Sequence, residues 1–398
     1  MQHVAVSNKD AIRHGLPIFI ASVNMRAGLL IMSPLLPILK EQYHLSAFLL
    51  SFLTSLSVLC FAGSAFLMPL VGKIGGTNRV IAIFLAVLTV AIFIRTVGDL
   101  PMLFMSSLTI GIATAVLNFS LPVWVKENAS EHSGLITGIY ITVMGVFAAI
   151  SVAFAVPLAS ATSWGWRLAM VPCLVMGVFS SAWWLIKYPK SSASYQMQLP
   201  SKFHRQLLRS PGAWSIAVYF GLQSMIYYGT ATWLPAILVS KGFTLSDAGF
   251  AVSITGLIGS LIGIMVPHYS SKLPNLRLLL AILGAVLAIC FLGIIFDNGW
   301  HLIIWLLISN ITFSATFTLS LLLTVKRSIN ASETRSLSIM AQAIGYSMSA
   351  FAPGIVGAIF DVTVDWNIAL IVPIALSIAL VAVGFFAGKP DKIVLDSL

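Results

Sequence analysis

Apolar segments of about twenty residues alternate with short polar stretches along the whole chain. A helix of this length spans the ~30 Å hydrocarbon core of a bilayer. The segments are continuously apolar rather than alternating, which indicates helices and excludes a transmembrane β-barrel. We therefore predict an all-α polytopic membrane protein with twelve transmembrane helices, at residues 16–39, 47–71, 79–96, 101–124, 134–159, 166–186, 213–239, 244–267, 276–296, 300–325, 337–360 and 366–387.

Composition and charge placement support this prediction. Hydrophobic residues make up 59% of the 398-residue chain and charged residues only 9%, which is unlike a soluble domain. A net charge of +10 would suggest nucleic acid in a soluble protein, but here the basic residues gather on one side of the predicted membrane. With a cytoplasmic N-terminus, seventeen Lys and Arg residues lie inside and four outside: Lys40, Arg95, Arg167 and Lys241. This asymmetry predicts that both termini are cytoplasmic, with the lipid bilayer as partner and no nucleic acid.

The chain reads as two related halves. Six spans lie in residues 1–186 and six lie in residues 211–398. The polar, basic stretch at 187–210 between them is predicted to be a cytoplasmic linker. The sequence Asn128-Ala129-Ser130-Glu131 recurs in the second half as Asn330-Ala331-Ser332-Glu333. In the same way, Leu36-Pro37 recurs as Leu234-Pro235. A duplicated six-plus-six arrangement resembles the major facilitator superfamily. That resemblance implies a central cavity lined by spans 1, 4, 7 and 10, with spans 5, 8 and 11 beside it.

Arg26 is the most informative single residue, because it lies near the middle of the first span. A charged side chain there costs about 2.5–3.5 kcal/mol on insertion scales. We expect no other charge inside a span, and no intramembrane Asp or Glu to pair with it. The planar guanidinium suits a small planar or carboxylate-like anion. The alternative is a structural, hydrogen-bonded arginine. Pro34 and Pro37 should also bend this helix and free backbone carbonyls.

Further candidates for substrate contact are polar and aromatic residues of the cavity-lining spans, although interhelical hydrogen bonding is an alternative use for each polar one. They are Ser33 in span 1, Asn118 and Phe119 in span 4 with Thr114 one turn earlier, Gln223, Tyr227 and Tyr228 in span 7, Asn310 in span 10, and Gln342 and Tyr346 in span 11.

Three stretches resemble a particular family. Asn24-Met25-Arg26 followed by Ser33-Pro34-Leu35-Leu36-Pro37 is similar to the first-span signature of the bacterial cyanate permease and 2-nitroimidazole transporter family. The segments 211–222 with 233–236, and 340–346 with 352–353, are similar to the same family. The resemblance implies a small anionic or polar planar solute, adds Asn24 to the candidate site, and implies a bacterial inner-membrane location. Ala27 stands where the family usually has proline, which places the bend lower, at Pro34.

The sequence carries no signature of an enzyme. It lacks His-Glu-x-x-His, Gly-x-Ser-x-Gly, paired intramembrane carboxylates and a phosphate-binding loop. Cys60, Cys173 and Cys290 are isolated within spans, so no metal, disulfide or cofactor is expected. Without a nucleotide-binding domain, transport is expected to be secondary, by a monomer.

Two functional hypotheses follow from these residues. The first is a carrier that moves a small anionic substrate, cyanate-like or an organic acid, by alternating access around Arg26. The second is an exporter of neutral or weakly acidic aromatic compounds such as nitroimidazoles or drugs, suggested by Phe119, Tyr227, Tyr228, Trp233 and Tyr346.

Overall fold

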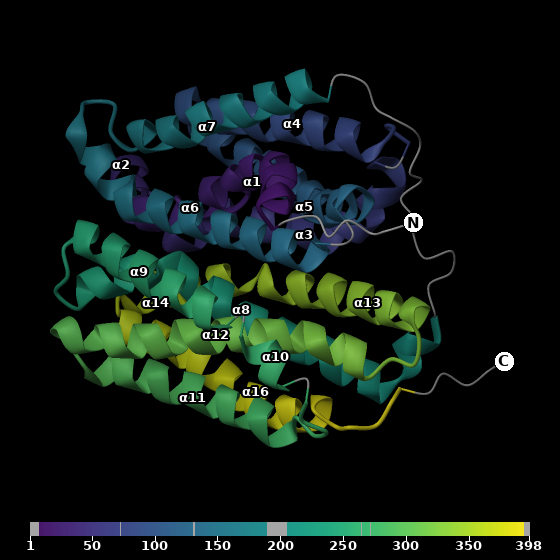
Figure 1. Cartoon of the computed structure of the whole chain (residues 1–398). Coiled ribbons are helices and arrows are strands. Elements are labelled where there is room, and N and C mark those ends of the chain that lie inside the picture. The colour runs from purple at the N-terminus through teal and green to yellow at the C-terminus, as the bar shows by residue number, and fades with distance from the viewer. Residues whose placement is uncertain are drawn as a thin grey trace.

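The computed structural model describes residues 8–393, apart from 72, 130–131, 189–204, 264 and 271. Within these ranges the regular elements are all helices (Figure 1). Most of the predicted linker at 187–210 therefore lies outside the described residues. The described part of it contains the short 3-10 helix η3 (Arg205–Arg209).

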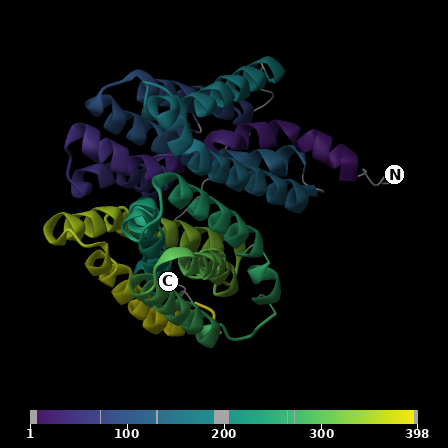
Figure 2. The same cartoon turned by 90° about the vertical axis from the view of Figure 1, so that its left-hand side faces the viewer.

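The helices form twelve crossings. The first six are α1 (Asn8–Leu30) with η1 (Ser33–Leu35) and α2 (Leu36–Tyr43), α3 (Ala47–Val71), α4 (Thr77–Val97), α5 (Leu100–Asn128), α6 (Ser133–Ala161) and α7 (Trp166–Lys187). The last six are α8 (Pro211–Ser240), α9 (Leu245–Gly263) with α10 (Val266–Ser270), α11 (Arg277–Phe296), α12 (Leu302–Lys326) after η4 (Gly299–His301), α13 (Ala331–Ser349) with α14 (Ala352–Thr363), and α15 (Trp366–Ala369) with α16 (Ile371–Ala387). Figures 1 and 2 show the first group, purple to blue, on one side of the molecule and the second group, green to yellow, on the other.

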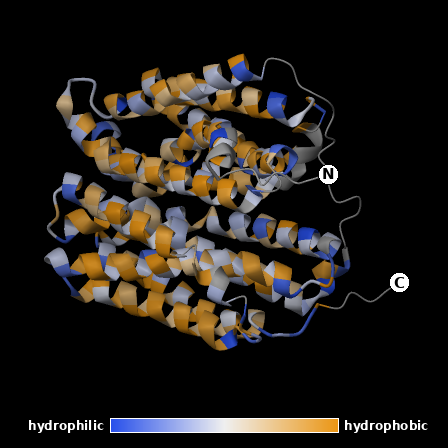
Figure 3. Cartoon of the chain, viewed as in Figure 1, coloured by the Kyte–Doolittle hydropathy of each residue, from blue (hydrophilic) through white to orange (hydrophobic). Residues whose placement is uncertain are grey.

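The prediction of a polytopic helical membrane protein is confirmed. Eleven helical segments in the described ranges are long and apolar enough to cross a membrane. The remaining crossing is α8, which has 30 residues but is less apolar because it carries polar side chains into the interior. Large apolar side chains such as Met105, Ile186 and Leu278 are more than two-thirds exposed, as lipid-facing residues are. Apolar residues run along the helices, and hydrophilic ones lie mainly in turns and helix ends (Figure 3).

The predicted break in the first span is confirmed. The last α-helical bond of α1 runs from the Ile31 N–H to the Ala27 carbonyl, at 3.1 Å. Pro34 then lies in η1, and Pro37 lies in the first turn of α2. Because proline has no N–H and its ring crowds the preceding turn, a regular helix cannot pass through this point. The regular helix of the first crossing is therefore interrupted between Leu30 and Leu36, more than one turn beyond Arg26.

Glycines let two helices of the second half approach closely. A Cβ atom built on Gly263 would lie 1.8 Å from the Ser314 Oγ, and one on Gly259 would lie 2.6 Å from the Asn310 carbonyl carbon. Small residues at a membrane helix interface allow such backbone contact. The contact places Asn310 and Ser314 of α12 directly against α9.

Candidate functional site: a cavity between the two halves

A cavity of about 400 Å³ lies between the two halves. Its walls come from α1, α5, α8 and α12, with contributions from α3, α6, α9 and α13. The participation of α3, through Phe61 and Ser64, was not anticipated from the sequence. Ten of the eleven predicted site residues line this cavity: Arg26, Ser33, Asn118, Phe119, Gln223, Tyr227, Tyr228, Asn310, Gln342 and Tyr346.

Of the described residues that line this cavity, Arg26 is the one that carries a charge. Its side chain is exposed to the cavity, and among the described residues it has no hydrogen-bond or ion-pair partner. Tyr140, Tyr228 and Tyr346 lie within electrostatic range of the guanidinium. The structural alternative for this arginine therefore has no acceptor in the described part of the chain to support it. An unpaired guanidinium in a cavity can bind an anion through several donors.

Asn118 gives the first half a second free polar group in the cavity. It is exposed there and has no hydrogen-bond partner within the described ranges. One turn earlier, Thr114 is buried, and its hydroxyl is also unpartnered. Arg26 on α1 and this turn of α5 together form a polar corner of the first half. Buried polar groups are normally satisfied, so unpaired ones beside a cavity are suited to a ligand or to water.

Other predicted polar residues line the cavity but already have protein partners. Ser33 donates to the carbonyls of Ala231 at 2.6 Å and Thr232 at 2.9 Å. Asn310 donates to the Leu306 carbonyl and, at 3.3 Å, to the Thr255 hydroxyl. Gln223 and Gln342 donate to the serine hydroxyls of Ser224 and Ser338. The bonds of Ser33 to α8 and of Asn310 to α9 join neighbouring helices, whereas the bonds of Gln223 and Gln342 stay within α8 and α13.

Asn24 is the exception among the predicted site residues. Its side chain is 2% exposed and donates from Nδ2 to the Cys173 carbonyl at 2.6 Å, so it connects α1 to α7. It does not line the cavity. The two-residue step from Arg26 turns Asn24 by about 200° around the helix, which places it on the opposite face. The geometry gives Asn24 a packing role, and the substrate contact expected from the family signature is not supported.

Some lining residues were missed by the sequence analysis. Ser253, Gly256 and Ser260 follow one face of α9, and Phe313 and Phe317 follow one face of α12. Their spacings of three and four residues are those of a single helical stripe. This signal was present in the sequence, but the two serines and the two phenylalanines were not singled out as candidates.

The expectation that Arg26 is the sole charge within the spans is wrong. Arg95, assigned to an outer loop, lies in the last turn of α4 and is 1% exposed. It donates to the Gly28 carbonyl at 2.7 Å and to the hydroxyls of Ser106 at 3.1 Å and Ser107 at 2.7 Å. An arginine near a helix end usually extends to the membrane surface. Here the surrounding helices α1 and α5 enclose it and supply acceptors.

Arg95 also explains how the break beside Arg26 is stabilised. The Gly28 carbonyl lies one residue beyond the last helical acceptor of α1, where the helix ends before Pro34. A freed carbonyl in a membrane interior must find a donor inside the protein. The Arg95 guanidinium provides that donor from α4. Arg95 is thus a positioning residue that holds the turn of α1 carrying Arg26.

We expect Arg95→Leu to lower the apparent melting temperature, because about three hydrogen bonds worth ~0.6 kcal/mol each in a bilayer are lost. Transport should fall as well, since the turn that carries Arg26 loses its anchor. Thermal unfolding in detergent and uptake by proteoliposomes measure the two effects. Arg167→Leu is the matched control, because within the described residues Arg167 makes one longer hydrogen bond, to the Gly98 carbonyl at 3.3 Å, and otherwise packs over the Trp166 ring. Equal effects of the two substitutions would contradict this role for Arg95.

Aromatic rings form a continuous surface along the cavity, here called the ring wall: Phe61, Tyr346, Tyr228, Tyr227 and Phe313. Successive ring centroids are 5.5, 6.5, 5.1 and 5.5 Å apart. Three of the four contacts are edge-to-face, the arrangement that the ring quadrupoles favour. All members except Phe61 come from the second half. Among the described lining residues the charge therefore lies on α1, whereas four of the five rings of the ring wall lie on α8, α12 and α13, beside the polar side chains of Gln223, Asn310 and Gln342.

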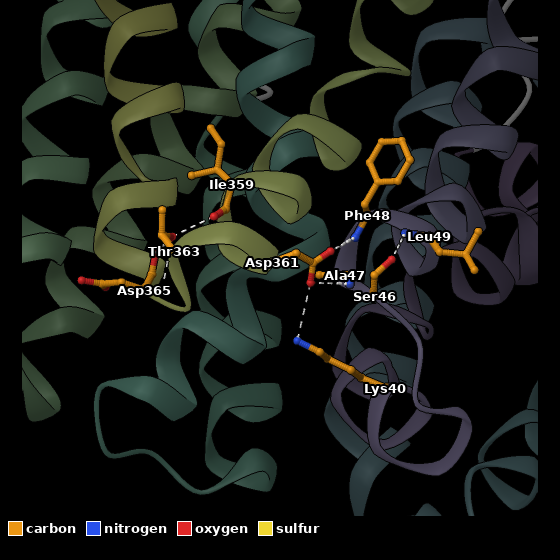
Figure 4. A network of polar contacts seen from close by, with 9 residues as sticks. All are labelled: Lys40, Ser46, Ala47, Phe48, Leu49, Ile359, Asp361, Thr363 and Asp365. Carbon is orange, nitrogen blue, oxygen red and sulfur yellow. Dashed lines mark hydrogen bonds and ion pairs between the residues drawn. The ribbon is translucent and has the colours of Figure 1, made fainter.

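The two halves are joined at the end of the bundle that holds Lys40, here called the Lys40 end (Figure 4). Asp361 of α14 accepts hydrogen bonds from the backbone N–H groups of Ala47 and Phe48, both at 2.8 Å. These are free donors in the first turn of α3, where a carboxylate is favourable. Lys40 lies 3.8 Å from Asp361 and packs over the Phe360 ring. The bonds of Ser33 to α8 reinforce this junction.

Comparisons with known proteins agree with this architecture. The sequence model of the Major Facilitator Superfamily matches residues 18–353. The chain is 30% identical over 383 residues to the uncharacterized transporter YycB of Bacillus subtilis (strain 168), covering 96% of this chain and 94% of that protein. It is 28% identical over 390 residues to the 2-nitroimidazole transporter of Escherichia coli (strain K12), covering 98% of each. With the cyanate transport protein CynX of the same organism it shares 23% identity, over 88% of this chain and 92% of that one.

Solved structures show the same fold. A D-xylose-proton symporter superimposes with a TM-score of 0.78 at 14% identity, over 97% of this chain and all of that one. A bacterial homologue of the human lysosomal transporter Spinster superimposes with a TM-score of 0.76 at 13% identity, over 96% and 98% of the two chains. Both the long sequence match and the fold lead to one conclusion. The chain belongs to the major facilitator superfamily, and it is a transporter rather than an enzyme.

Proposed function

We propose that this protein is a secondary carrier of a small anion, with Arg26 as the anion-binding group. The observation that carries the proposal is an unpaired guanidinium exposed in the cavity between the halves. An intramembrane charge without a counter-charge is costly, and an anionic substrate would provide that counter-charge. The halves, residues 1–186 and 211–398, would move against each other and expose the cavity to each side in turn.

The charge distribution supports both termini in the cytoplasm, and the similarity to bacterial transporters supports a bacterial inner-membrane location. The Lys40 end would then face outward. Because the contacts of Asp361 and Ser33 join the halves at this end, the structure would correspond to a carrier closed to the outside. We propose that a single chain, as a monomer, carries the complete pathway.

A second candidate is the export of neutral or weakly acidic aromatic compounds. The ring wall favours it, as does the similarity to a 2-nitroimidazole transporter, whose named substrate is an aromatic heterocycle. The similarity to a cyanate transport protein favours the anion instead. The two candidates differ in one testable respect, namely whether recognition needs a negative charge at Arg26.

A thermal-shift screen of the purified chain tests the proposal. Ligands that bind the folded state raise its apparent stability by RT ln(1 + [L]/Kd), about 2.7 kcal/mol at 100 times Kd. We expect small organic and inorganic anions to raise the melting temperature of the wild type and to have no effect on Arg26→Gln. Neutral nitroheterocycles at the same concentrations serve as the comparison. Stabilisation by neutral compounds alone, equal in both proteins, would favour the second candidate.

A further inference from the structure

Resting on the proposed anion carrier, we infer that the substrate is an aromatic monocarboxylate. Its carboxylate binds Arg26, and its ring lies against the ring wall of Phe61, Tyr346, Tyr228, Tyr227 and Phe313. Three features of the cavity lead to this assignment: its single charge among the described lining residues, its volume, and the position of the ring wall, which lies mostly on the half of the molecule that does not carry Arg26.

The charge of the cavity selects a monoanion. Arg26 is the one charged residue among the described residues of the lining, and the buried Arg95 lies outside it and donates to the Gly28 carbonyl and two hydroxyls. A dianion would carry one carboxylate into a polar but uncharged or aromatic part of the cavity. Burying a carboxylate without a partner is strongly unfavourable. The planar guanidinium matches the two oxygens of one carboxylate in a bidentate arrangement.

The volume of the cavity selects a substrate larger than a triatomic ion. At ~30 Å³ for each water molecule, the cavity of about 400 Å³ holds about thirteen waters. An ion of three atoms would replace one or two of them and would leave Arg26 largely hydrated. A benzoate-sized molecule fills several times that volume and brings its carboxylate into a drier environment, where the attraction to Arg26 is stronger.

The arrangement of the lining selects an aromatic body. The first half contributes Arg26 and the unpartnered Asn118, whereas the second half contributes most of the ring wall. A flat ring attached to a carboxylate can satisfy both sides at once, because ring edges pack against ring faces with favourable quadrupole alignment. Such a substrate would also touch both halves of the carrier, which couples its binding to their relative position.

The test uses the full-length protein in proteoliposomes and measures the Kd of a matched set of probes by competition and by thermal shift. The reference probe is benzoate. Benzamide has the same shape without charge, formate has the charge without the ring, terephthalate adds a second carboxylate, and cyclohexanecarboxylate replaces the flat ring. We expect benzoate to bind at least tenfold more tightly than benzamide, formate or terephthalate, and several-fold more tightly than cyclohexanecarboxylate.

Variants separate the two ends of the substrate. Arg26→Gln should abolish binding of both benzoate and formate. Tyr346→Leu should weaken benzoate about tenfold and formate by much less, because only the ring loses its contact. Phe93→Leu is the matched control, since Phe93 is an exposed ring of α4 outside the cavity.

The outcomes distinguish this inference from the function on which it rests. If formate binds as tightly as benzoate and both need Arg26, the aromatic assignment is overturned while the anion carrier stands. If terephthalate matches benzoate, the monocarboxylate assignment is overturned. If benzamide matches benzoate, or Arg26→Gln binds all probes normally, both the inference and the anion carrier fail. Failure of every probe to bind also overturns the inference.

Discussion

Replacing Arg26 with alanine is expected to reduce anion uptake into proteoliposomes by about 30–150-fold. This range corresponds to the loss of ~2–3 kcal/mol of charged hydrogen bonding between the guanidinium and the substrate. Among the described residues no other charged group lines the cavity, so none of them can take over the role. The fold should survive the change, because Arg26 makes no hydrogen bond or ion pair with any described part of the chain. The melting temperature without substrate should therefore stay close to that of the wild type.

Arg26→Lys sharpens this prediction. An ammonium keeps the positive charge but lacks the planar pair of donors, so we expect impaired uptake despite an unchanged net charge. Lys126→Ala is the control for a general effect of removing a basic residue, because Lys126 is exposed at the end of α5 and does not line the cavity. Wild-type uptake and unchanged inhibition by anions in Arg26→Ala would refute the assignment of Arg26 as the anion-binding group.

Asp361→Asn is expected to open the junction at the Lys40 end. The substitution removes the ion pair with Lys40 and weakens two charge-assisted bonds to the first turn of α3. The ion pair is partly exposed and worth less than ~1 kcal/mol, so most of the loss comes from the backbone bonds. A total of about 1.5–2.5 kcal/mol would lower the ratio of closed to open molecules by about 10–70-fold.

Spin labels can measure this shift directly. Gln42 and Val362 are exposed on opposite sides of the junction, so a cysteine pair at these positions reports its opening by electron–electron distance measurement. Asp365→Asn is the matched control, since the Asp365 carboxylate caps α15 through the Asn367 N–H and acts within one half only. An unchanged distance distribution in Asp361→Asn would show that this carboxylate does not hold the halves together.

These two variants report on different steps. Arg26 acts on the substrate, whereas Asp361 acts on the equilibrium between the halves. A ligand shifts such an equilibrium only as far as its affinities for the two states differ. Substrate should therefore change the spin-label distances in the wild type, and this change should be lost in Arg26→Gln. The combination tests whether binding at Arg26 is coupled to the junction at the Lys40 end.

Much of the fold could be predicted from the sequence, because the bilayer imposes strong local rules. Twenty apolar residues must form a helix, since every backbone group needs an internal partner. The break in the first crossing follows from Pro34 for a similarly local reason. The inward direction of Gln223, Tyr227 and Gln342 follows from the cost of polar groups in lipid.

The same rules could not separate the kinds of interior. Asn24 and Arg26 are two residues apart, yet one faces α7 and the other faces the cavity. A polar residue that points away from lipid can meet either a packed helix or an open space. Whether it contacts a packed helix or an open cavity depends on helices that are far away in the sequence. The local sequence pattern does not indicate where those helices lie.

The sequence by itself therefore determined the twelve crossings, the bend beyond Arg26, the family resemblance and nearly all of the cavity candidates. The tertiary structure alone decided which polar groups are free and which are already satisfied. Arg95 meets Gly28 across 67 residues, and Asp361 meets Ala47 across 314. Such long-range partners decide whether a polar or charged group in the chain holds helices together or remains available to a substrate.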